Sequence, residues 1–442
     1  MKKNKYLIFC GFILLALAFN FKMNIAGSAS FFNNFQYDGE SLVVGRLILS
    51  ERNNIFDHAR FLGWVQPTPA GLDPYLYQYE AYQHAYDFES YQAYYSHPAY
   101  QSLAYGVICA VTGMNGYPAL DFLKWLVSIF TALLFTLFIA WVQRRWGWAT
   151  AFFVFFTVCF SQWVTAFGRN LFWILGAFYV PFVFALWYLQ KYEPNDRRSI
   201  RTTFWLMFFT MLFKCLFTGF EYITTALVMS VTPWFFYAIM NRWGWKKFLQ
   251  SVSVASAGAL AAVVAGIACL TVQLSSVSGS ISRGFKYILT SFGRRSHGNA
   301  GEFDSFFRES LDSNLWDVLR AYWNGHAIDL SHWFDHPLWQ SVGKVSFGFC
   351  VLLFLLITWV VFQSKIIRKH PVFRRQQVAL AMMLWISLLA PLSWFVIFKA
   401  HSYVHTHMNH IVWHMPFILL GAAFMGSTLW FFIRNIFAKG GE

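Results

Sequence analysis

Long apolar runs, separated by short polar segments rich in Lys and Arg, make up most of the chain. A helix needs roughly 20 mainly apolar residues to cross a bilayer, and runs of about that length recur along the sequence. They lie at 6–23, 120–143, 148–167, 171–190, 203–220, 222–240, 248–273, 345–363, 378–398 and 411–433. The pattern predicts an all-α polytopic membrane protein with about ten transmembrane helices.

The first apolar run follows three lysines, Lys2, Lys3 and Lys5, and resembles a signal peptide in this respect. A signal peptide ends at a cleavage site of small residues, and the nearest such stretch, 26–29, does not follow the run cleanly. We therefore interpret the run as an uncleaved first span whose N-terminus lies in the cytoplasm.

The composition supports a membrane protein. The chain is 57% hydrophobic and only 12% charged, whereas soluble domains have about 25% charged residues. The net charge of +14 arises largely from basic residues at 144–145, 191–201, 242–247, 365–375 and 434–439, all on the side predicted for the N-terminus. Cytoplasmic segments of membrane proteins carry such an excess, so the charge indicates topology rather than nucleic-acid binding.

Two long segments, 24–119 and 274–344, fall on the opposite, extracytoplasmic side. They predict three parts: an N-terminal membrane module, 1–273, that includes the first loop; an extracytoplasmic subdomain, 274–344; and a C-terminal membrane module, 345–442. Aromatic residues in 274–344 suit amphipathic helices on the membrane surface. Six cysteines are scattered singly, so they support neither a disulfide framework nor a thiolate metal site.

The first outer loop begins with Tyr37, Asp38, Gly39 and Glu40. A carboxylate just beyond a membrane span lies at the boundary between lipid and water, where it could accept the proton of an attacking hydroxyl group. The alternative is that Asp38 caps a helix that starts near Gly39. Further along, ten tyrosines between 75 and 105 suit either sugar rings or the aromatic belt of a membrane interface.

Ionisable residues also lie beside or within later spans. Arg169 and Asn170 occupy an outer turn, Lys214 lies within an apolar run, and Glu221 follows at an outer helix end. Charged groups within a membrane are costly and indicate function by default, although Lys214 could simply pair with another helix.

The densest polar cluster, 399–410, includes Lys399, His401, His405 and His407. The i,i+4 spacing of His401 and His405 is compatible with two zinc ligands on one helix face, but no HExxH glutamate accompanies them. A lysine beside several histidines at the outer surface equally suits a phosphate-bearing lipid. We expect Asp38 to share an outer cavity with this cluster.

In this order, the features resemble the GT-C superfamily of integral membrane glycosyltransferases. The resemblance rests on the first-loop acids, on Ser96-His97-Pro98-Ala99-Tyr100, on 168–173, on 218–222 and on 399–405. It implies transfer of a monosaccharide from a polyprenyl-phosphate donor to an extracytoplasmic glycan or lipid-linked acceptor, in a bacterial cytoplasmic membrane with the active site on the outer face. Membrane lipids are further partners, nucleic acid is not, no cofactor is certain, and a divalent metal stays open.

The resemblance also implies residue roles. Asp38 would be the general base, with Glu40 and Glu221 as the other catalytic acids. Arg169, Lys399, His401 and His405 would hold the donor phosphate, and Tyr37, His97, Asn170 and His407 would contact substrates. Two other readings stay open: a transporter or flippase with Lys214, Glu221 and Arg169 along its pathway, and a polysaccharide polymerase or ligase.

Overall fold

The structure is a computed structural model that describes residues 2–193 and 196–439. Its helices are α1 (Lys2–Met23), α2 (Tyr37–Arg52), α3 (Pro74–His84), α4 (Tyr100–Thr112), α5 (Gly116–Trp146), α6 (Trp148–Phe160), α7 (Gln162–Phe167), α8 (Leu175–Lys191), α9 (Arg197–Thr218), α10 (Ile223–Met240), α11 (Trp245–Ser278), α12 (Ile281–Arg295), α13 (Ser305–Asp312), α14 (Leu315–Asn324), α15 (Pro337–Val342), α16 (Phe347–Gln363), α17 (Lys365–Arg368), α18 (Pro371–Ser387), α19 (Leu389–Ile397), α20 (Lys399–Val404), α21 (Thr406–Asn409) and α22 (Phe417–Lys439). Short 3₁₀ segments lie at Phe32–Asn34, Asp57–Arg60, Ala300–Glu302, Ser331–Trp333 and His410–His414. Strands β1 (Leu62–Gln66) and β2 (Ser90–Tyr94) form one antiparallel pair, and β3 (His326–Asp329) and β4 (Lys344–Ser346) form another.

The helices confirm an all-α, multi-pass membrane protein. Within the described residues, seven segments are long and apolar enough to cross a membrane: Asn4–Met23, Gly116–Trp146, Arg197–Thr218, Ile223–Met240, Trp245–Ser278, Pro371–Ile397 and Phe417–Ile436. The other three expected spans, 148–167, 171–190 and 345–363, are also helical but shorter. Helices α8 and α16 have 17 residues each, and a helix of that length rises about 25 Å.

A serine divides the expected span 148–167. The Ser161 hydroxyl accepts a hydrogen bond from the backbone N–H of Val164 at 3.2 Å and so caps α7. The same hydroxyl lies 2.9 Å from Nε2 of His414, which comes from a segment 253 residues later. The long-range contact holds the break between α6 and α7 in place.

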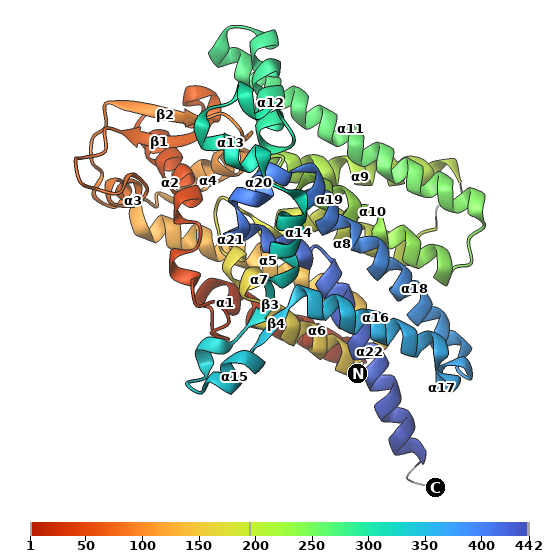
Figure 1. Cartoon of the computed structure of the whole chain (residues 1–442). Helices are drawn as coiled ribbons and strands as arrows, with labels where there is room; N and C mark the ends of the chain where they lie inside the picture. The colour runs from red at the N-terminus through yellow and green to blue at the C-terminus, as the bar shows by residue number, and fades with distance from the viewer. Residues whose placement is uncertain (1, 194–195, 440–442) are drawn as a thin grey trace.

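The two ends of the helix bundle differ (Figure 1). Both chain termini and α17 lie toward the lower right of the view, and β1, β2, α3 and α13 lie toward the upper left. The long segments 24–119 and 274–344 thus lie largely at the end away from the termini, as the charge pattern predicts. Helix α11 extends to Ser278, a little beyond the predicted boundary at 273. The division into three parts stays a prediction.

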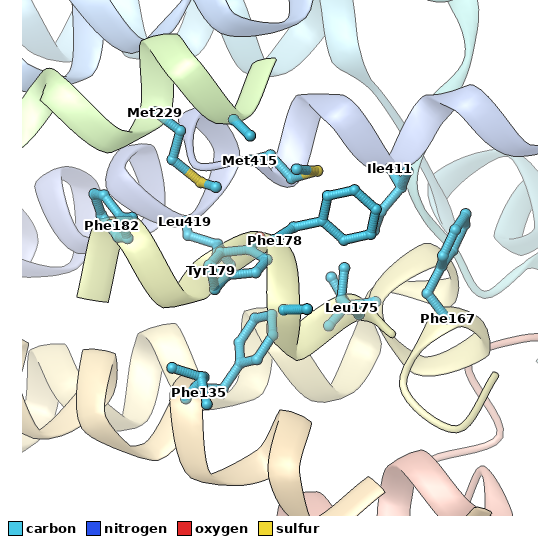
Figure 2. Packing of buried hydrophobic residues seen from close by; sticks show 14 of the residues in the cluster. Phe135, Phe167, Leu175, Phe178, Tyr179, Phe182, Met229, Ile411, Met415 and Leu419 are labelled. Atoms are coloured by element: carbon cyan, nitrogen blue, oxygen red, sulfur yellow. The ribbon is translucent and has the colours of Figure 1, made fainter. Parts of the chain in front are cut away.

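Buried aromatic and aliphatic side chains join the helices at the centre of the bundle (Figure 2). Helix α8 supplies Phe178, Tyr179 and Phe182 to this core, which also includes Phe135, Phe167, Leu175, Met229, Ile411, Met415 and Leu419. The hydroxyl of the fully enclosed Tyr179 donates to the carbonyl oxygen of His414 at 2.6 Å. A buried hydroxyl without such a partner would destabilise the fold, so this bond fixes α8 against the 3₁₀ segment that precedes α22.

Helix α2 packs against the β1–β2 pair at the end of the bundle away from the termini. Gly45 of α2 lies directly against β1, where a Cβ atom would overlap the carbonyl oxygen of Gly63. The side chain of Gln78, from α3, fills the adjacent space and bonds both the N–H of Val65, at 2.9 Å, and its carbonyl, at 3.2 Å. These contacts fix the position of α2, whose first turn carries the predicted acids.

We expect Gly45→Ala to destabilise the protein by roughly 1–3 kcal/mol, because overpacking displaces backbone in a well-packed region. Gly11→Ala is the matched control: Gly11 also lies within a helix, and a Cβ there meets nothing within 4 Å. Thermal unfolding of both variants in the same detergent measures the difference. Equal unfolding temperatures would contradict the close packing of α2 on β1.

Candidate active site

A cavity of about 320 Å³ lies between the start of α2, the turn that precedes α10, the end of α12, and α20. We call it the acid–histidine cavity. It is lined by Gln36, Asp38, Gly39, Leu42, Trp64, Tyr75, Tyr94, Phe172, Trp173, Glu221, Arg294, Arg295, Phe306, Phe307, Ser310, Ala400, His401, Val404, His405 and Met408. The structure thus brings together Asp38, Glu221, His401 and His405, which the sequence analysis chose from three distant segments.

Asp38 is the second residue of α2. The helix begins at Tyr37, and its N-cap is Gln36, whose backbone is in the left-handed region and whose side chain makes no capping bond. The alternative in which Asp38 caps a helix starting at Gly39 is therefore wrong. The side chain is exposed in the cavity wall and makes no hydrogen bond or ion pair with any described residue. An unpaired carboxylate in a cavity is available to accept a proton.

Asn170 shapes the wall beside Asp38. Its side-chain oxygen accepts hydrogen bonds from the N–H groups of Phe172, at 3.0 Å, and Trp173, at 2.8 Å. This turn carries the Phe172 and Trp173 rings to the acid–histidine cavity, where Trp173 stacks on Tyr222 at 5.6 Å. Asn170 is buried and its amide oxygen positions this turn, while the residue also lines a second cavity on the other side of α2. Its predicted substrate contact stays a prediction.

Glu221 is a buried acid with charged neighbours. Its carboxylate lies 3.2 Å from Nη1 of Arg295 and 3.7 Å from Nε2 of His401. Arg295 also donates to the hydroxyl of Tyr94 at 3.1 Å. Burial lowers the pKa of Arg295, but the carboxylate of Glu221, together with the hydroxyls of Tyr94 and Tyr287, raises that pKa above its usual value. Glu221 is therefore neutralised by a permanent cation, which makes it a weaker base candidate than Asp38.

Lys214 holds the turn that carries Glu221. Its ammonium group donates to the carbonyl oxygens of Gly219, at 2.8 Å, and Glu221, at 2.6 Å. The side chain is fully buried and lies 5.1 Å from the ring of Phe178. Lys214 thus satisfies the last carbonyls after α9 rather than pairing with an acid on another helix.

The histidines of the cavity are neutral near pH 7. Burial, with His405 and Arg295 nearby, lowers the pKa of His401 well below its usual value. Burial lowers the pKa of His405 to about 4, although Glu221 and Asp38 oppose the shift. The two rings lie 4.4 Å apart, and Nδ1 of His405 has no hydrogen-bond partner among the described residues. They can offer hydrogen bonds but not positive charge. His407, next to His405, is exposed and does not line this cavity.

The sequence analysis missed the arginine pair at the end of α12. Arg294 and Arg295 both line the cavity, and Arg294 contacts only the ring of Phe307, at 4.6 Å, among the described residues. Arg294 is therefore a guanidinium with no acidic partner in the cavity wall. Adjacent arginines are unusual on the side of a membrane protein that faces away from the cytoplasm, and this bias could have identified them.

Glu40 faces a different cavity, of about 420 Å³, which we call the Glu40 cavity. It is lined by Phe32, Asn33, Asn34, Phe35, Tyr37, Glu40, Leu76, Tyr79, Tyr117, Lys124, Ala166, Arg169 and Asn170. Glu40 is buried, pairs with Lys124 at 2.6 Å, and accepts hydrogen bonds from the Tyr79 hydroxyl and the Leu171 N–H, both at 3.1 Å. Both carboxylate oxygens therefore have partners, which gives Glu40 a structural role, and its predicted catalytic role stays a prediction.

The other predicted phosphate ligands lie outside the acid–histidine cavity. Arg169 lines the Glu40 cavity, stacks over the ring of Phe32 at 3.9 Å and donates to its carbonyl oxygen at 3.2 Å. Lys399 is buried, and its ammonium group donates to the carbonyls of Leu311 and Ser313, both at 2.7 Å, at the end of α13. The structure therefore uses both cations to satisfy backbone carbonyls.

Two predicted substrate contacts also lie elsewhere. His97 is buried beneath Gly219, and its Nδ1 accepts from the N–H of Ala99 at 2.9 Å. Burial lowers its pKa to about 3, so the ring is neutral. Tyr37 lines the Glu40 cavity, and its hydroxyl donates to Asp73 at 3.3 Å. Neither side chain lines the acid–histidine cavity.

The zinc alternative finds no ligand set. In the described part of the chain, no group of three or more His, Cys, Asp and Glu side chains could hold a metal ion. His401 and His405 thus lack the further protein ligands that a zinc site normally has.

Comparisons with known proteins return a distant structural likeness. No protein-family model matches the sequence, and no curated protein matches it. The structure is similar to an archaeal oligosaccharyltransferase, AglB from Archaeoglobus fulgidus, which was solved in complex with an inhibitory peptide and a dolichol-phosphate. The match has 11% sequence identity and a TM-score of 0.43, and it covers 100% of this chain and 52% of that one. The chain thus spans about half the length of AglB, and the likeness assigns no role to any of its residues.

Proposed function

We propose that the protein is a membrane glycosyltransferase that moves a monosaccharide from a polyprenyl-phosphate donor to an extracytoplasmic glycan or lipid acceptor. The observation that carries the proposal is that one cavity wall contains both the carboxylate of Asp38 and the guanidinium of Arg294, and that neither group forms an ion pair with a described residue. A base and a phosphate-binding cation are the two charged groups that glycosyl transfer from a lipid phosphate needs.

An apolar cavity next to the acid–histidine cavity supports a lipid-linked donor. It has a volume of about 200 Å³ and is lined mostly by side chains of α10, α11, α12 and α19, including Ile223, Val263, Leu270 and Phe292. Arg295 lines both cavities. A polyprenyl phosphate has an apolar chain, an anionic phosphate and a sugar in that order. The two cavities together can hold such a donor, with its polyprenyl chain beside α11, its phosphate at Arg294 and Arg295, and its sugar toward Asp38.

The reaction is a single displacement at the anomeric carbon. The acceptor oxygen forms a bond to that carbon while the bond to the phosphate oxygen breaks. Asp38 takes the hydroxyl proton of the acceptor, and the electron pair of the broken bond remains on the lipid phosphate. Because the acceptor enters opposite the leaving group, the anomeric configuration inverts. Arg294 and Arg295 stabilise the phosphate, and the neutral imidazole of His405 supplies a hydrogen bond without further charge.

The Glu40 cavity suits the acceptor. Asn33, Asn34, Tyr79 and Tyr117 present amides, hydroxyls and aromatic faces to it, which match the polar edges and apolar faces of sugar rings. The first turn of α2 separates the two cavities, with Tyr37 and Glu40 on one side and Asp38 on the other. An acceptor hydroxyl that passes this turn meets Asp38 first.

The transporter alternative has less support. Its proposed pathway residues lie apart, because Arg169 lines the Glu40 cavity, Glu221 lines the acid–histidine cavity, and Lys214 bonds turn carbonyls. The basic end of the bundle, which holds both termini, would face the cytoplasm by the positive-inside rule. In our proposal the active site therefore lies on the extracytoplasmic face of a bacterial cytoplasmic membrane.

Asp38→Asn should lower turnover by roughly 10²–10⁴-fold while donor binding persists, because the amide keeps the size of the side chain but accepts no proton. Transfer from radiolabelled polyprenyl-phosphate sugars by the purified protein measures turnover. Glu80→Gln, on the exposed face of α3, is the control and should keep full activity. Full activity of Asp38→Asn together with loss in Glu221→Gln would instead make Glu221 the base.

Arg294→Ala should reduce kcat/KM by roughly 10–150-fold, which corresponds to one charge-assisted hydrogen bond of about 1.5–3 kcal/mol. Lys399→Met should instead lower thermal stability, because it leaves the carbonyls of Leu311 and Ser313 without their donor. Steady-state kinetics and thermal unfolding of both variants separate the two roles. The reverse pattern, with intact kinetics in Arg294→Ala and a kinetic defect in folded Lys399→Met, would restore Lys399 as the phosphate ligand.

A further inference from the structure

A second basic cavity lies at the opposite end of the bundle from the candidate active site. It has a volume of about 530 Å³ and is formed where α5 ends, α18 begins and α22 approaches its end. In Figure 1, the labelled C-terminus of α22 and the neighbouring α17 mark this end of the molecule. The proposed glycosyl transfer makes no use of this cavity.

The charges in its wall are all of one sign. Arg145, His370 and Arg434 line the cavity, and no Asp or Glu is among its described lining residues. Arg145 is partly held by aromatic contacts: its guanidinium lies 5.3 Å from the ring of Tyr237 and donates to that hydroxyl at 3.3 Å. A cationic hollow without acids attracts an anion.

Two hydrogen-bond donors in the wall lack an acceptor. Nε of Arg145 and Nε1 of Trp146 are buried and have no hydrogen-bond partner among the described residues. Trp146 is only 8% exposed. Most buried polar groups in proteins are paired, and an unpaired one destabilises the fold. Arg145 and Trp146, which both line the cavity, thus carry donor groups that no described residue satisfies.

The depth of the cavity indicates where the anion comes from. One neighbouring membrane segment starts at Pro371 and another ends at Ile436, so the cavity lies at the level where spans leave the lipid. Phe373 and Phe431 stack at 4.0 Å beside it, and Trp430, also in the wall, is 38% exposed. Tryptophan at this level is typical of the membrane interface, where lipid phosphates lie.

We propose that this cavity binds the phosphate headgroup of an anionic phospholipid from the adjacent leaflet. The guanidinium groups of Arg145 and Arg434 supply positive charge to the headgroup, and the acyl chains lie along the exposed aromatic side chains. Basic pockets between membrane helices recognise anionic lipids in this way. The bound lipid would link α5, α18 and α22, which all contribute to the wall.

Native mass spectrometry of the full-length protein in detergent tests the proposal, with phosphatidylglycerol, phosphatidylcholine and inorganic phosphate as separate probes. We expect phosphatidylglycerol to bind and raise the unfolding temperature, phosphatidylcholine to bind at least 10-fold more weakly, and inorganic phosphate alone to have no effect. Arg434→Gln should weaken phosphatidylglycerol binding by about 5-fold, the worth of one charge near a membrane surface.

Arg374→Gln is the matched control, because Arg374 is exposed on the first turns of α18 but does not line the cavity. Arg145→Gln is a second test variant, and its lipid binding is scored only on folded protein. Equal binding of the two lipids, or equal phosphatidylglycerol binding by Arg434→Gln and Arg374→Gln, would overturn the site. If inorganic phosphate raised the unfolding temperature as much as phosphatidylglycerol does, the ligand would be a soluble anion, and the proposal of a lipid ligand would be wrong. None of these measurements depends on glycosyl transfer, so they test the lipid site independently of the proposed function.

Discussion

The candidate site depends on the interactions of one buried carboxylate, that of Glu40. Its partners come from three other parts of the chain, namely Lys124 of α5, Tyr79 of α3 and the N–H of Leu171. A buried charge is tolerated only where its bonds are complete, and here both oxygens have donors. If helix α2 rotated, the carboxylate of Glu40 would lose these partners while it is still buried, which is unfavourable. Asp38 precedes Glu40 by two residues, about 200° around the helix, so the same contact directs Asp38 into the acid–histidine cavity.

Other buried charges near the candidate site also have polar or charged partners. Glu221 is paired with Arg295, and the ammonium groups of Lys214 and Lys399 bond backbone carbonyls that end helices. Each of these charges stabilises the structure, because burial without such partners is unfavourable. Among the Asp, Glu and Arg residues that line the acid–histidine cavity, Asp38 and Arg294 form no ion pair with any described residue. Unpaired charges of opposite sign in one cavity wall are consistent with the base and the phosphate-binding cation that we propose.

The sequence predicted what depends on local pattern. Run length identified the helices, and the positions of acids and histidines at span ends brought Asp38, Glu221, His401 and His405 to one cavity. Their catalytic and binding roles stay predictions. The sequence could not separate Asp38 from Glu40, because that choice depends on how α2 is rotated by distant partners. Nor could it show that Lys399 bonds carbonyls of α13, or that a contact with His414 keeps α6 and α7 apart, since these partners are 86 or more residues away.

The charge balance of the cavity suits a reaction in which negative charge grows on the leaving group. A sugar linked through a phosphodiester carries one negative charge, and the released lipid phosphate gains a second as the bond breaks. Arg294 would therefore stabilise the transition state more than the bound donor, and only such differential binding accelerates the chemical step. If His401 and His405 were charged as well, they would bind the donor and the product tightly and would not favour the transition state over either of them. Burial lowers the pKa of both rings, so the cavity presents neutral imidazoles, which in our proposal bond the phosphate without adding charge.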